Sequence, residues 1–302
     1  MTFCEKSLIA FRVCALFLPF TLLSCSHDLI DSDSGNPQPV RYVAIDIDDV
    51  FMPNWDYTTQ KYGKVKMNED DVKNLVQFSA EVQSLFGERF RFTLGFNCGF
   101  YDSTNPGDRA FLACRNEFDW YDHLPRHEQV MSSHYSAAQI ESLFTIGSAF
   151  AARYDLKLSH YQITPAHEGL WPPYDPLYQA FEKFGIQYTA AAALTERASY
   201  GTVIIIPRHY IGISSAEYSF TQVSRDRLQR FADDDYRLVM ENPAVVFYSH
   251  QVNYAGDRIA EVLIRMLIGK FQAQTTYRIM FLPAEDVAKI VHDTPLVVHK
   301  IF

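Results

Sequence analysis

Apolar residues follow two alternating patterns from residue 41 onward. Short runs rich in β-branched and aromatic residues predict strands, and segments with apolar positions three and four residues apart predict helices. The first strand, "YVAIDID" at 42–48, precedes a helical segment at 69–86, "EDDVKNLVQFSAEVQSLF", whose opening turn is acidic, as helix N-termini prefer. This alternation of strands with longer helices predicts α/β architecture.

The same alternation continues along the chain and predicts a (β/α) barrel. About seven or eight strands with mostly helical crossovers, in roughly 260 residues, suit a closed barrel of this kind, distorted or lacking a strand or helix. The further strands are predicted at 91–97, 117–123, 157–164, 187–194, 203–208, 244–250 and 277–283, and the further helices at 108–116, 136–153, 175–184, 224–240, 256–271 and 284–291.

Polar side chains fall where the predicted strands end. Barrels of this class carry their chemistry at the carboxyl ends of the strands. We therefore expect residues far apart in sequence to converge on one mouth. In chain order they are Asp48, Asp49, Asn97, His123, His167, Arg208 and His250.

The first strand ends in three crowded carboxylates, Asp46, Asp48 and Asp49, in the stretch "AIDIDDVF". Like charges repel and burial penalises each further, so such a cluster needs a cation or a catalytic duty, unless it is a loop cluster with structural salt bridges. The stretch "HLPRH" sets His123 and His127 four apart, so both face one way if the second begins a helix. One aspartate and these two imidazoles would make an open divalent metal site, whereas surface histidines are the alternative.

Other side chains near the strand ends are candidates for substrate contact or proton transfer. His250 is either a structural hydrogen bonder or, if it meets the metal site, a general acid. His167 and Arg208 would hold substrate oxygens. The alternatives are a loop hydrogen bond for His167 and a surface cation for Arg208. Asn97 is a further substrate-binding candidate, and Tyr254 and Trp171 are either sugar platforms or packed side chains.

Charge and the N-terminal segment add predictions about partners and location. The formal net charge of -9 and the lack of a basic run argue against nucleic-acid binding.

Residues 1–25 contain the apolar stretch "VCALFLPFTLL" and then "SC", which predict a lipoprotein-type signal with lipidation at Cys25. The alternatives are an ordinary cleaved signal or a mispredicted start. Residues 26–40 predict a flexible tether and 41–302 the catalytic domain. A bacterial cell-envelope location follows, periplasmic or surface-exposed, with membrane contact only through the lipid.

Two cysteines, Cys98 and Cys114, fall within the predicted domain. Their number excludes a disulfide framework, and neither has the spacing of a zinc site. A single bridge between them and two buried thiols both remain open.

Several matched blocks carry a family resemblance. "IDIDDVF", "FTLGFN", "TPAHEG", "IPR" and "NPAVVFYSHQVNYAGDR" occur in order. From about Val43 to about Val291 the chain resembles the N-deacetylase domain of heparan sulfate N-deacetylase/N-sulfotransferases, relatives of the polysaccharide deacetylases. The resemblance departs from many deacetylases at Val50, where they have glycine, and in lacking an evident arginine-containing third motif.

The resemblance implies a distorted barrel of the polysaccharide deacetylase type and a metal-dependent amide hydrolase. It implies Asp48 as catalytic base, Asp49, His123 and His127 as ligands of a divalent metal, most simply Zn²⁺, and His250 as acid. The implied partner is a polysaccharide that contains N-acetylhexosamine.

Two rival functions follow from the same residues. "IDIDDV" also fits a phosphatase of the haloacid dehalogenase type with Asp46 as nucleophile, although the acidic run "ADDDY" at 232–236 lies in a predicted helix and not after a strand. The second rival is a non-catalytic glycan-binding surface lipoprotein on the same fold.

Overall fold

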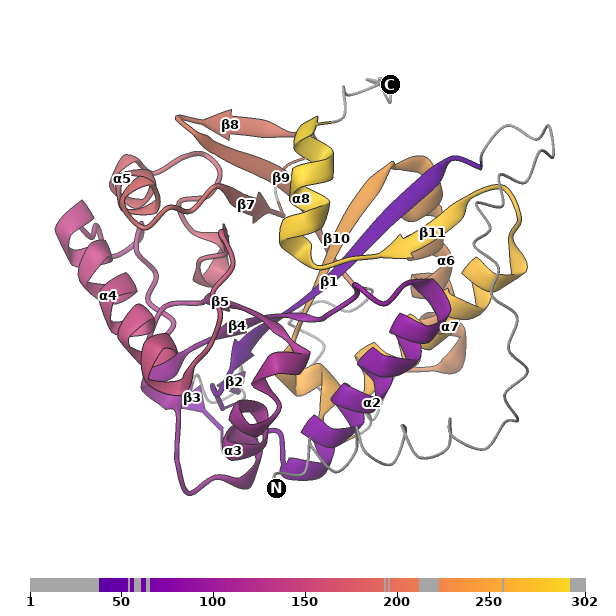
Figure 1. Ribbon diagram of the computed structural model, residues 1–302, viewed down its shortest axis with the longest axis horizontal. Coiled ribbons are helices and arrows are strands. Elements are labelled where there is room, and N and C mark those ends of the chain that lie inside the picture. The colour runs from indigo at the N-terminus through magenta and orange to yellow at the C-terminus, as the bar shows by residue number, and fades with distance from the viewer. Residues whose placement is uncertain are drawn as a thin grey trace, which may run out of the picture.

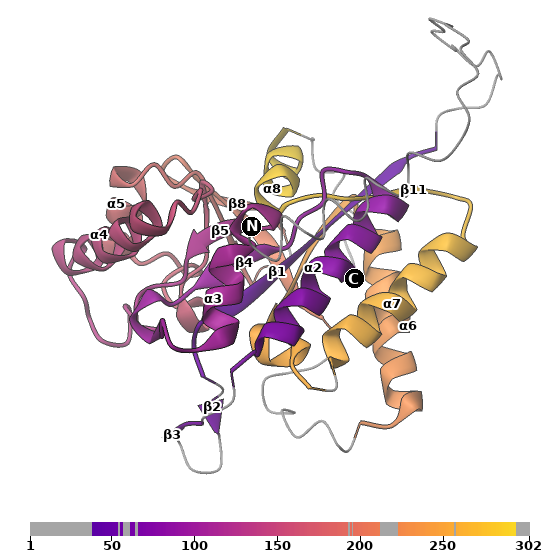
Figure 2. The ribbon, with the colours of Figure 1, turned by 60° about the horizontal axis from the view of Figure 1, so that its bottom comes forward.

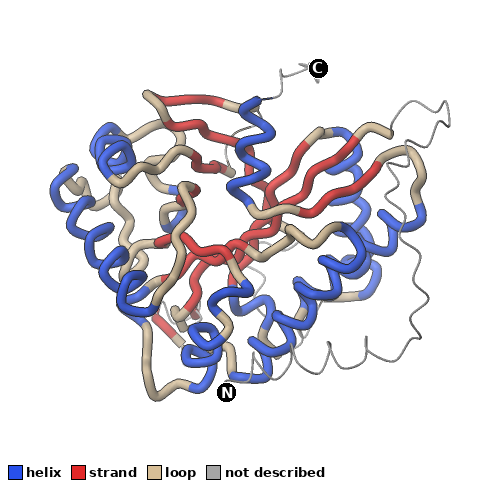
Figure 3. Tube along the Cα trace, viewed as in Figure 1, coloured by secondary structure: helices blue, strands red, loops and turns tan. Residues whose placement is uncertain are grey.

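The computed structural model of the chain describes residues 38–53, 55–56, 61–63, 66–192, 194, 196–211, 223–256 and 258–293. Its centre is a largely parallel sheet that curls into a nearly closed barrel, with helices around the outside (Figures 1 and 3). The principal strands are β1 (Val40–Val50), β4 (Thr93–Phe96), β5 (Asp119–Asp122), β6 (Tyr161–Gln162), β7 (Tyr188–Ala191), β9 (Val203–Tyr210), β10 (Ala244–His250) and β11 (Arg278–Phe281).

The strand order confirms the predicted barrel. Neighbouring strands run β5-β4-β1-β10-β9-β7-β6, and β11 pairs with the first part of β1. A parallel bridge between Trp120 in β5 and Leu158, just before β6, brings the two edges of the sheet together. The carboxyl ends of the strands therefore surround one mouth, as the sequence predicts.

Each predicted strand has a counterpart, but three short strands were not predicted. They are β2 (Trp55–Asp56), β3 (Lys61–Tyr62) and β8 (Ala198–Tyr200), the last antiparallel to β9. Strands of two or three residues are too short to show an alternating pattern.

The helices cover the barrel on two sides, with α2, α6 and α7 on one side and α4 and α5 on the other (Figure 2). Local capping explains several starts: Asn68 and Ser136 each form a capping box with the residue three positions on. Asn105 is the N-cap of the helix Pro106–Ala113, which therefore begins at a proline, two residues before the predicted start. The helices are α2 (Glu69–Phe86), α3 (Pro106–Ala113), α4 (Ala137–Tyr154), α5 (Asp175–Lys183), α6 (Arg225–Glu241), α7 (Ile259–Ala273) and α8 (Ala284–Asp293), with 3-10 turns at η1 (Cys98–Phe100), η2 (Arg115–Glu117), η3 (Pro165–His167) and η6 (Gln251–Tyr254).

Strand β1 divides the core into two parts. Its odd positions from Val43 to Ile47 join the cluster under α2 and α7, and Ala44 joins the cluster with Tyr121 and Tyr161. Because side chains alternate along a strand, Asp46 and Asp48 share the side of Ala44. The first two carboxylates are therefore directed into the barrel and are buried there.

Gly147 in α4 allows that helix to lie against the end of β5. A Cβ at this position would overlap the carboxylate of Asp122, the last residue of β5. Gly147→Ala is expected to lower the free energy of unfolding by about 1–3 kcal/mol through overpacking. Gly269→Ala in α7 meets nothing within 4 Å and is the matched control, expected to be neutral or stabilising by up to about 1 kcal/mol. Urea denaturation of both variants tests this, and equal losses would contradict it.

The N-terminal segment, the two cysteines and the relation to a membrane are the remaining features that the sequence raised. Residues 1–37, including Cys25 and most of the predicted tether, lie outside the described residues. Cys98 is a free thiol, so the bridge to Cys114 is not formed. Among the described segments, no helix combines the length and the apolar character needed to cross a bilayer.

Candidate metal and catalytic site

Asp49 reaches the mouth through an irregularity at the end of β1. The register between β1 and β4 shifts between Ile47 and Val50, and Asp49 has φ 67°. On a regular strand Asp49 would face away from Asp48. The bulge and the left-handed backbone turn it so that both carboxylates lie near His123.

His123 and His127 approach Asp49 from the loop after β5. Their Nε2 atoms lie 3.5 and 3.4 Å from Asp49 Oδ1, and the two ring centroids are 5.5 Å apart. No helix begins at His127, and the pair is brought together by a turn in which Leu124 and His127 have φ near 60°. The side chain of Asn97 donates to the carbonyls of residues 123 and 124 and so holds this turn.

The donor set fits a divalent cation. Ligand atoms of Asp49, His123 and His127 all lie within 4.8 Å of one another, and Asp49 Oδ1 is buried without a hydrogen-bond partner. His123 Nδ1 is 3.0 Å from the carbonyl of Ile163, which can only accept, so the proton sits on Nδ1 and the Nε2 lone pair faces Asp49. Two acceptors that face each other call for a shared proton or a cation between them. One carboxylate oxygen and two imidazole nitrogens suit Zn²⁺.

The two histidines differ electrostatically. Burial lowers the pKa of His127, and the neighbouring His123 and His250 add to this against the attraction of Asp49. Burial also opposes the charging of His123, but Asp48 and Asp49 outweigh it and raise its pKa. The neutral form that metal ligation requires is thus favoured at His127 and less favoured at His123.

His250 lies on the opposite side of Asp49. The parallel register of β1 and β10 sets His250 opposite Asp48, and its Nε2 is 3.7 Å from Asp49 Oδ2. Its Nδ1 is 3.1 Å from the hydroxyl of Tyr210. The ring is only partly buried, so His250 combines access from the mouth with a fixed place beside both carboxylates.

Arg208 holds the other two carboxylates. Its Nη2 is 2.7 Å from Asp46 Oδ1 and 2.8 Å from Asp48 Oδ1, and it is 1% exposed. Burial acts to raise the pKa of Asp48, but Arg208 and His123 outweigh it and lower the pKa, so Asp48 is ionised. Burial raises the pKa of Asp46 to about 6 against the opposing effect of Arg208. The buried cation is what allows two carboxylates to share this space.

Two tyrosines complete this buried network. Burial and Asp48 raise the pKa of Tyr121, which stays protonated and donates to Asp48. Tyr161 donates to Asp46 Oδ2 at 2.7 Å. Asp46 is fully buried behind these partners, which leaves it inaccessible as the nucleophile that a phosphatase of the haloacid dehalogenase type needs.

His167 borders the network on the mouth side. Its Nε2 is 3.4 Å from Arg208 Nη1, and its ring packs edge-on against Tyr248. Burial and Arg208 lower the pKa of His167 to about 3, so the ring is neutral at pH 7. Its Nδ1 is buried without a hydrogen-bond partner, and the residue has φ 56°. A neutral ring with an unused nitrogen can bond a substrate group.

The other predicted contact residues are placed differently. Tyr254 is 2% exposed, packs against Phe92 and shares a hydrogen bond with Ser249 at 3.1 Å, so its ring presents no face to a ligand. Trp171 is 40% exposed on the loop that follows His167. Of the two candidate platforms, only Trp171 offers an aromatic surface to a sugar.

Sequence reasoning missed three tyrosines of this site. Tyr121 and Tyr161 lie within strands whose patterns predict only packing, and Tyr210 follows Arg208 by two residues in β9. Alternation along β9 places Tyr210 on the same side as Arg208, and this spacing was the available signal.

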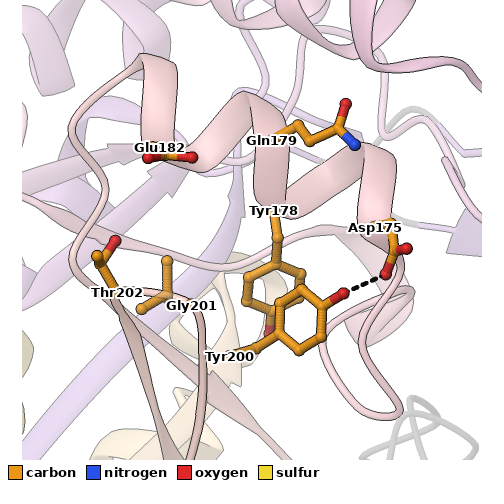
Figure 4. A pocket seen from close by; sticks show the side chains of 8 residues that line it. Asp175, Tyr178, Gln179, Glu182, Tyr200, Gly201 and Thr202 are labelled. Carbon is orange, nitrogen blue, oxygen red and sulfur yellow. Dashed lines mark hydrogen bonds between the residues drawn. The ribbon is translucent and has the colours of Figure 1, made fainter.

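A surface pocket elsewhere is not part of this site (Figure 4). It lies between α5 and the β8–β9 hairpin, where Tyr200 donates to Asp175. It adjoins Val203 at the start of β9, whereas Arg208 lies about 17 Å further along the strand at roughly 3.3 Å per residue. Its residues therefore serve as controls remote from the mouth.

In the comparisons with known proteins, the chain matches heparan sulfate N-deacetylases. The family model for the heparan sulfate N-deacetylase deacetylase domain matches residues 40–206. A bifunctional heparan sulfate N-deacetylase/N-sulfotransferase 1 of Caenorhabditis briggsae is 25% identical over 83% of this chain and 30% of its own length. A bifunctional heparan sulfate N-deacetylase/N-sulfotransferase 2 of Mus musculus is 27% identical over 82% and 29%. The chain thus spans less than a third of the length of these relatives.

Solved structures share the fold. Agd3, described as a novel carbohydrate deacetylase, superposes with a TM-score of 0.66 at 13% identity, over 84% of this chain and 54% of its own. A putative polysaccharide deacetylase from Mycobacterium smegmatis gives a TM-score of 0.58 at 13% identity, over 94% and 99%. These likenesses support the barrel of the polysaccharide deacetylase type.

One prediction is corrected by the relatives. The sequence predicted a lipid-anchored protein of the bacterial cell envelope. Matching curated proteins include animal enzymes from nematodes, a fly and mammals, so that localisation is wrong. The N-terminal stretch from which that localisation was predicted lies outside the described residues.

The family match extends over more than half of the chain, and it contains Asp48, Asp49, His123 and His127. The chain belongs to the family of the heparan sulfate N-deacetylase deacetylase domain.

Proposed function

We propose that the protein is a metal-dependent N-deacetylase, which hydrolyses the N-acetyl amide of hexosamine units in a polysaccharide. The observation that carries this proposal is the convergence of Asp49, His123 and His127 on one point, with His250 and the ionised carboxylate of Asp48 beside them. A divalent cation, most simply Zn²⁺, held by those three residues would supply Lewis-acid polarisation of the acetamide carbonyl.

Asp48 is suited to act as the base. Arg208 and Tyr121 hold its carboxylate, and the pKa of Asp48 is lowered, so the carboxylate is in the ionised form that a base requires. Asp48 takes a proton from the attacking water while the water oxygen bonds to the acetyl carbon. Arg208 keeps the carboxylate in one orientation throughout this transfer.

His250 is suited to act as the acid. It lies opposite Asp48 in the register of β1 and β10, with Nε2 directed to Asp49. His250 delivers a proton to the amide nitrogen as the C–N bond breaks, which releases the amine of the sugar and acetate. His167, neutral and with an unused Nδ1, is placed to bond an oxygen of the substrate.

The substrate class rests on the family and on charge. The relatives are named for heparan sulfate N-deacetylation, which supports a glycan with N-acetylhexosamine units. The net charge of -9 disfavours a densely sulfated chain, because like charges repel at long range. We infer a neutral or uronic-acid-containing chain that is not yet heavily sulfated.

Acetate release tests this function directly. Wild-type protein loaded with Zn²⁺ is expected to release acetate from a panel of N-acetylated glycans. Asp48→Asn and His250→Gln are each expected to lower kcat by about 10²- to 10⁴-fold, because each removes one proton-transfer group. Both variants keep His123 and His127, so their zinc content should match wild type.

The matched control is Asp175→Asn, a carboxylate change in the remote pocket, which should leave acetate release unchanged. Glycan binding by wild type without acetate at saturating Zn²⁺ would instead indicate a glycan-binding protein.

A further inference from the structure

We propose that Tyr210 is a positioning residue that holds the imidazole of His250 in its working orientation; this inference rests on the proposed function of His250 as acid. Tyr210 Oη lies 3.1 Å from His250 Nδ1, and the opposite ring nitrogen, Nε2, lies 3.7 Å from Asp49 Oδ2. The hydroxyl therefore engages the nitrogen that does not face the reaction. A ring bonded at Nδ1 cannot turn about its own axis without losing that bond.

The place of the hydroxyl is fixed by strands. Tyr210 ends β9 and pairs with Tyr248 of β10, and Ile211 N donates to the Tyr248 carbonyl at 3.0 Å. The Tyr210 ring packs on Tyr248 at 4.7 Å and an interplanar angle of 79°. It also contacts the cluster formed by Ile259 and Leu263 at the start of α7. Packing against Tyr248 and against this cluster restricts the phenol, as positioning requires.

The chemistry of a phenol suits either tautomer of the imidazole. A hydroxyl both donates and accepts, so it donates to Nδ1 when that atom carries a lone pair and accepts when it carries a proton. Because His250 delivers its proton from Nε2, Nδ1 keeps its own proton during the transfer, and the hydroxyl accepts from it before and after.

Tyr210 and Arg208 act from one strand on the two proton-transfer residues. They are two positions apart on β9 and face the same side, and Arg208 bonds Asp48 while Tyr210 bonds His250. Strand β9 thus orients the base and the acid together, although it supplies neither.

Tyr210→Phe tests this inference, because it removes the hydroxyl and keeps the ring that packs. We expect kcat for acetate release to fall by about 3- to 10-fold, the effect of one neutral hydrogen bond, with KM and zinc content unchanged. Tyr200→Phe is the matched control, since it also removes a bonded phenol hydroxyl but at the remote pocket, and it should leave kcat unchanged. A purely structural role would change the stability and leave the kcat of the folded enzyme intact.

A spectroscopic readout is independent of turnover. In metal-free protein with ¹⁵N-labelled histidine, the His250 signal is assigned by its loss in His250→Gln. The Nδ1 resonance of His250 should move in Tyr210→Phe and stay in Tyr200→Phe.

The outcomes separate the two proposals. An active wild type whose kcat and Nδ1 resonance are unchanged in Tyr210→Phe overturns the role of Tyr210 alone. A wild type that releases no acetate from any glycan overturns the proposed function, and the positioning role with it.

Discussion

Asp49→Ala and His127→Ala are each expected to abolish bound zinc and acetate release together. Each removes one of three ligand atoms that lie within 4.8 Å of one another. The two remaining ligands leave the cation largely to water, and binding falls by orders of magnitude because each ligand contributes to a cooperative site. Metal analysis of the purified variants, alongside the acetate assay, measures both losses.

A control separates metal loss from misfolding. Asp175→Asn should retain zinc and activity, and the circular dichroism of all three variants should match that of wild type. Removal of zinc from wild type with a chelator should reproduce the loss of activity, and added Zn²⁺ should restore it in wild type but not in the two ligand variants. Normal turnover in either ligand variant would refute this site.

Arg208→Met is expected to lower the free energy of unfolding by about 3–5 kcal/mol, the usual effect of breaking a buried ion pair. The substitution leaves Asp46 and Asp48 buried without their shared cation, and Tyr121 and Tyr161 cannot supply a positive charge. Arg208→Lys should recover only part of the loss, since an ammonium cannot form the planar fork that engages both carboxylates. Denaturation of metal-free protein by urea measures the difference.

The defect of Arg208→Met should depend on pH. In wild type the pKa of Asp48 is below its ordinary value of 3.8, so Asp48 contributes stability above that value, and this stability is lost as the pH falls. In the variant the pKa of the buried carboxylates is raised, so their contribution is present at low pH and is lost as the pH rises. Between pH 4 and pH 7 the contribution of Asp48 to wild type is nearly complete, and the gap between wild type and variant grows because the variant must ionise its buried carboxylates there. Asp46, whose pKa is raised to about 6 in wild type as well, offsets part of this growth. A gap that is constant between these pH values would contradict the charge-based explanation.

The succession of strands and helices along the chain was predictable from periodicity, because long strands and amphipathic helices carry strong patterns. The placing of polar residues at one mouth followed from the barrel that this succession predicts. Asp48, Asp49, His123, His127 and His250 were identified in this way and by family resemblance, and the structure brings them together.

Local backbone geometry was not predictable. Nothing in "HLPRH" indicates that the two imidazoles are brought together by residues with left-handed backbone instead of by a helix. The conformation of this turn depends on the side-chain amide of Asn97 and on contacts with other strands. Arg208 was predicted to hold substrate oxygens, with a surface cation as the alternative, but it is buried because two carboxylates stabilise its charge. Pairings of this kind join residues about 160 apart and leave no local signal.

The central place of β1 has a consequence for biosynthesis. Its partners β10 and β11 come from the last sixty or so residues of the chain, with Tyr42 set beside Ala244. Contacts between such distant segments form late and slow the folding of a domain. A ribosome that has delivered the chain only as far as residue 206, where the family match ends, has exposed a strand with one bare edge and an acidic cluster without its cation. The edge of β1 therefore stays unpaired until β10 and β11 have been synthesised, and until then the nascent protein needs protection from aggregation.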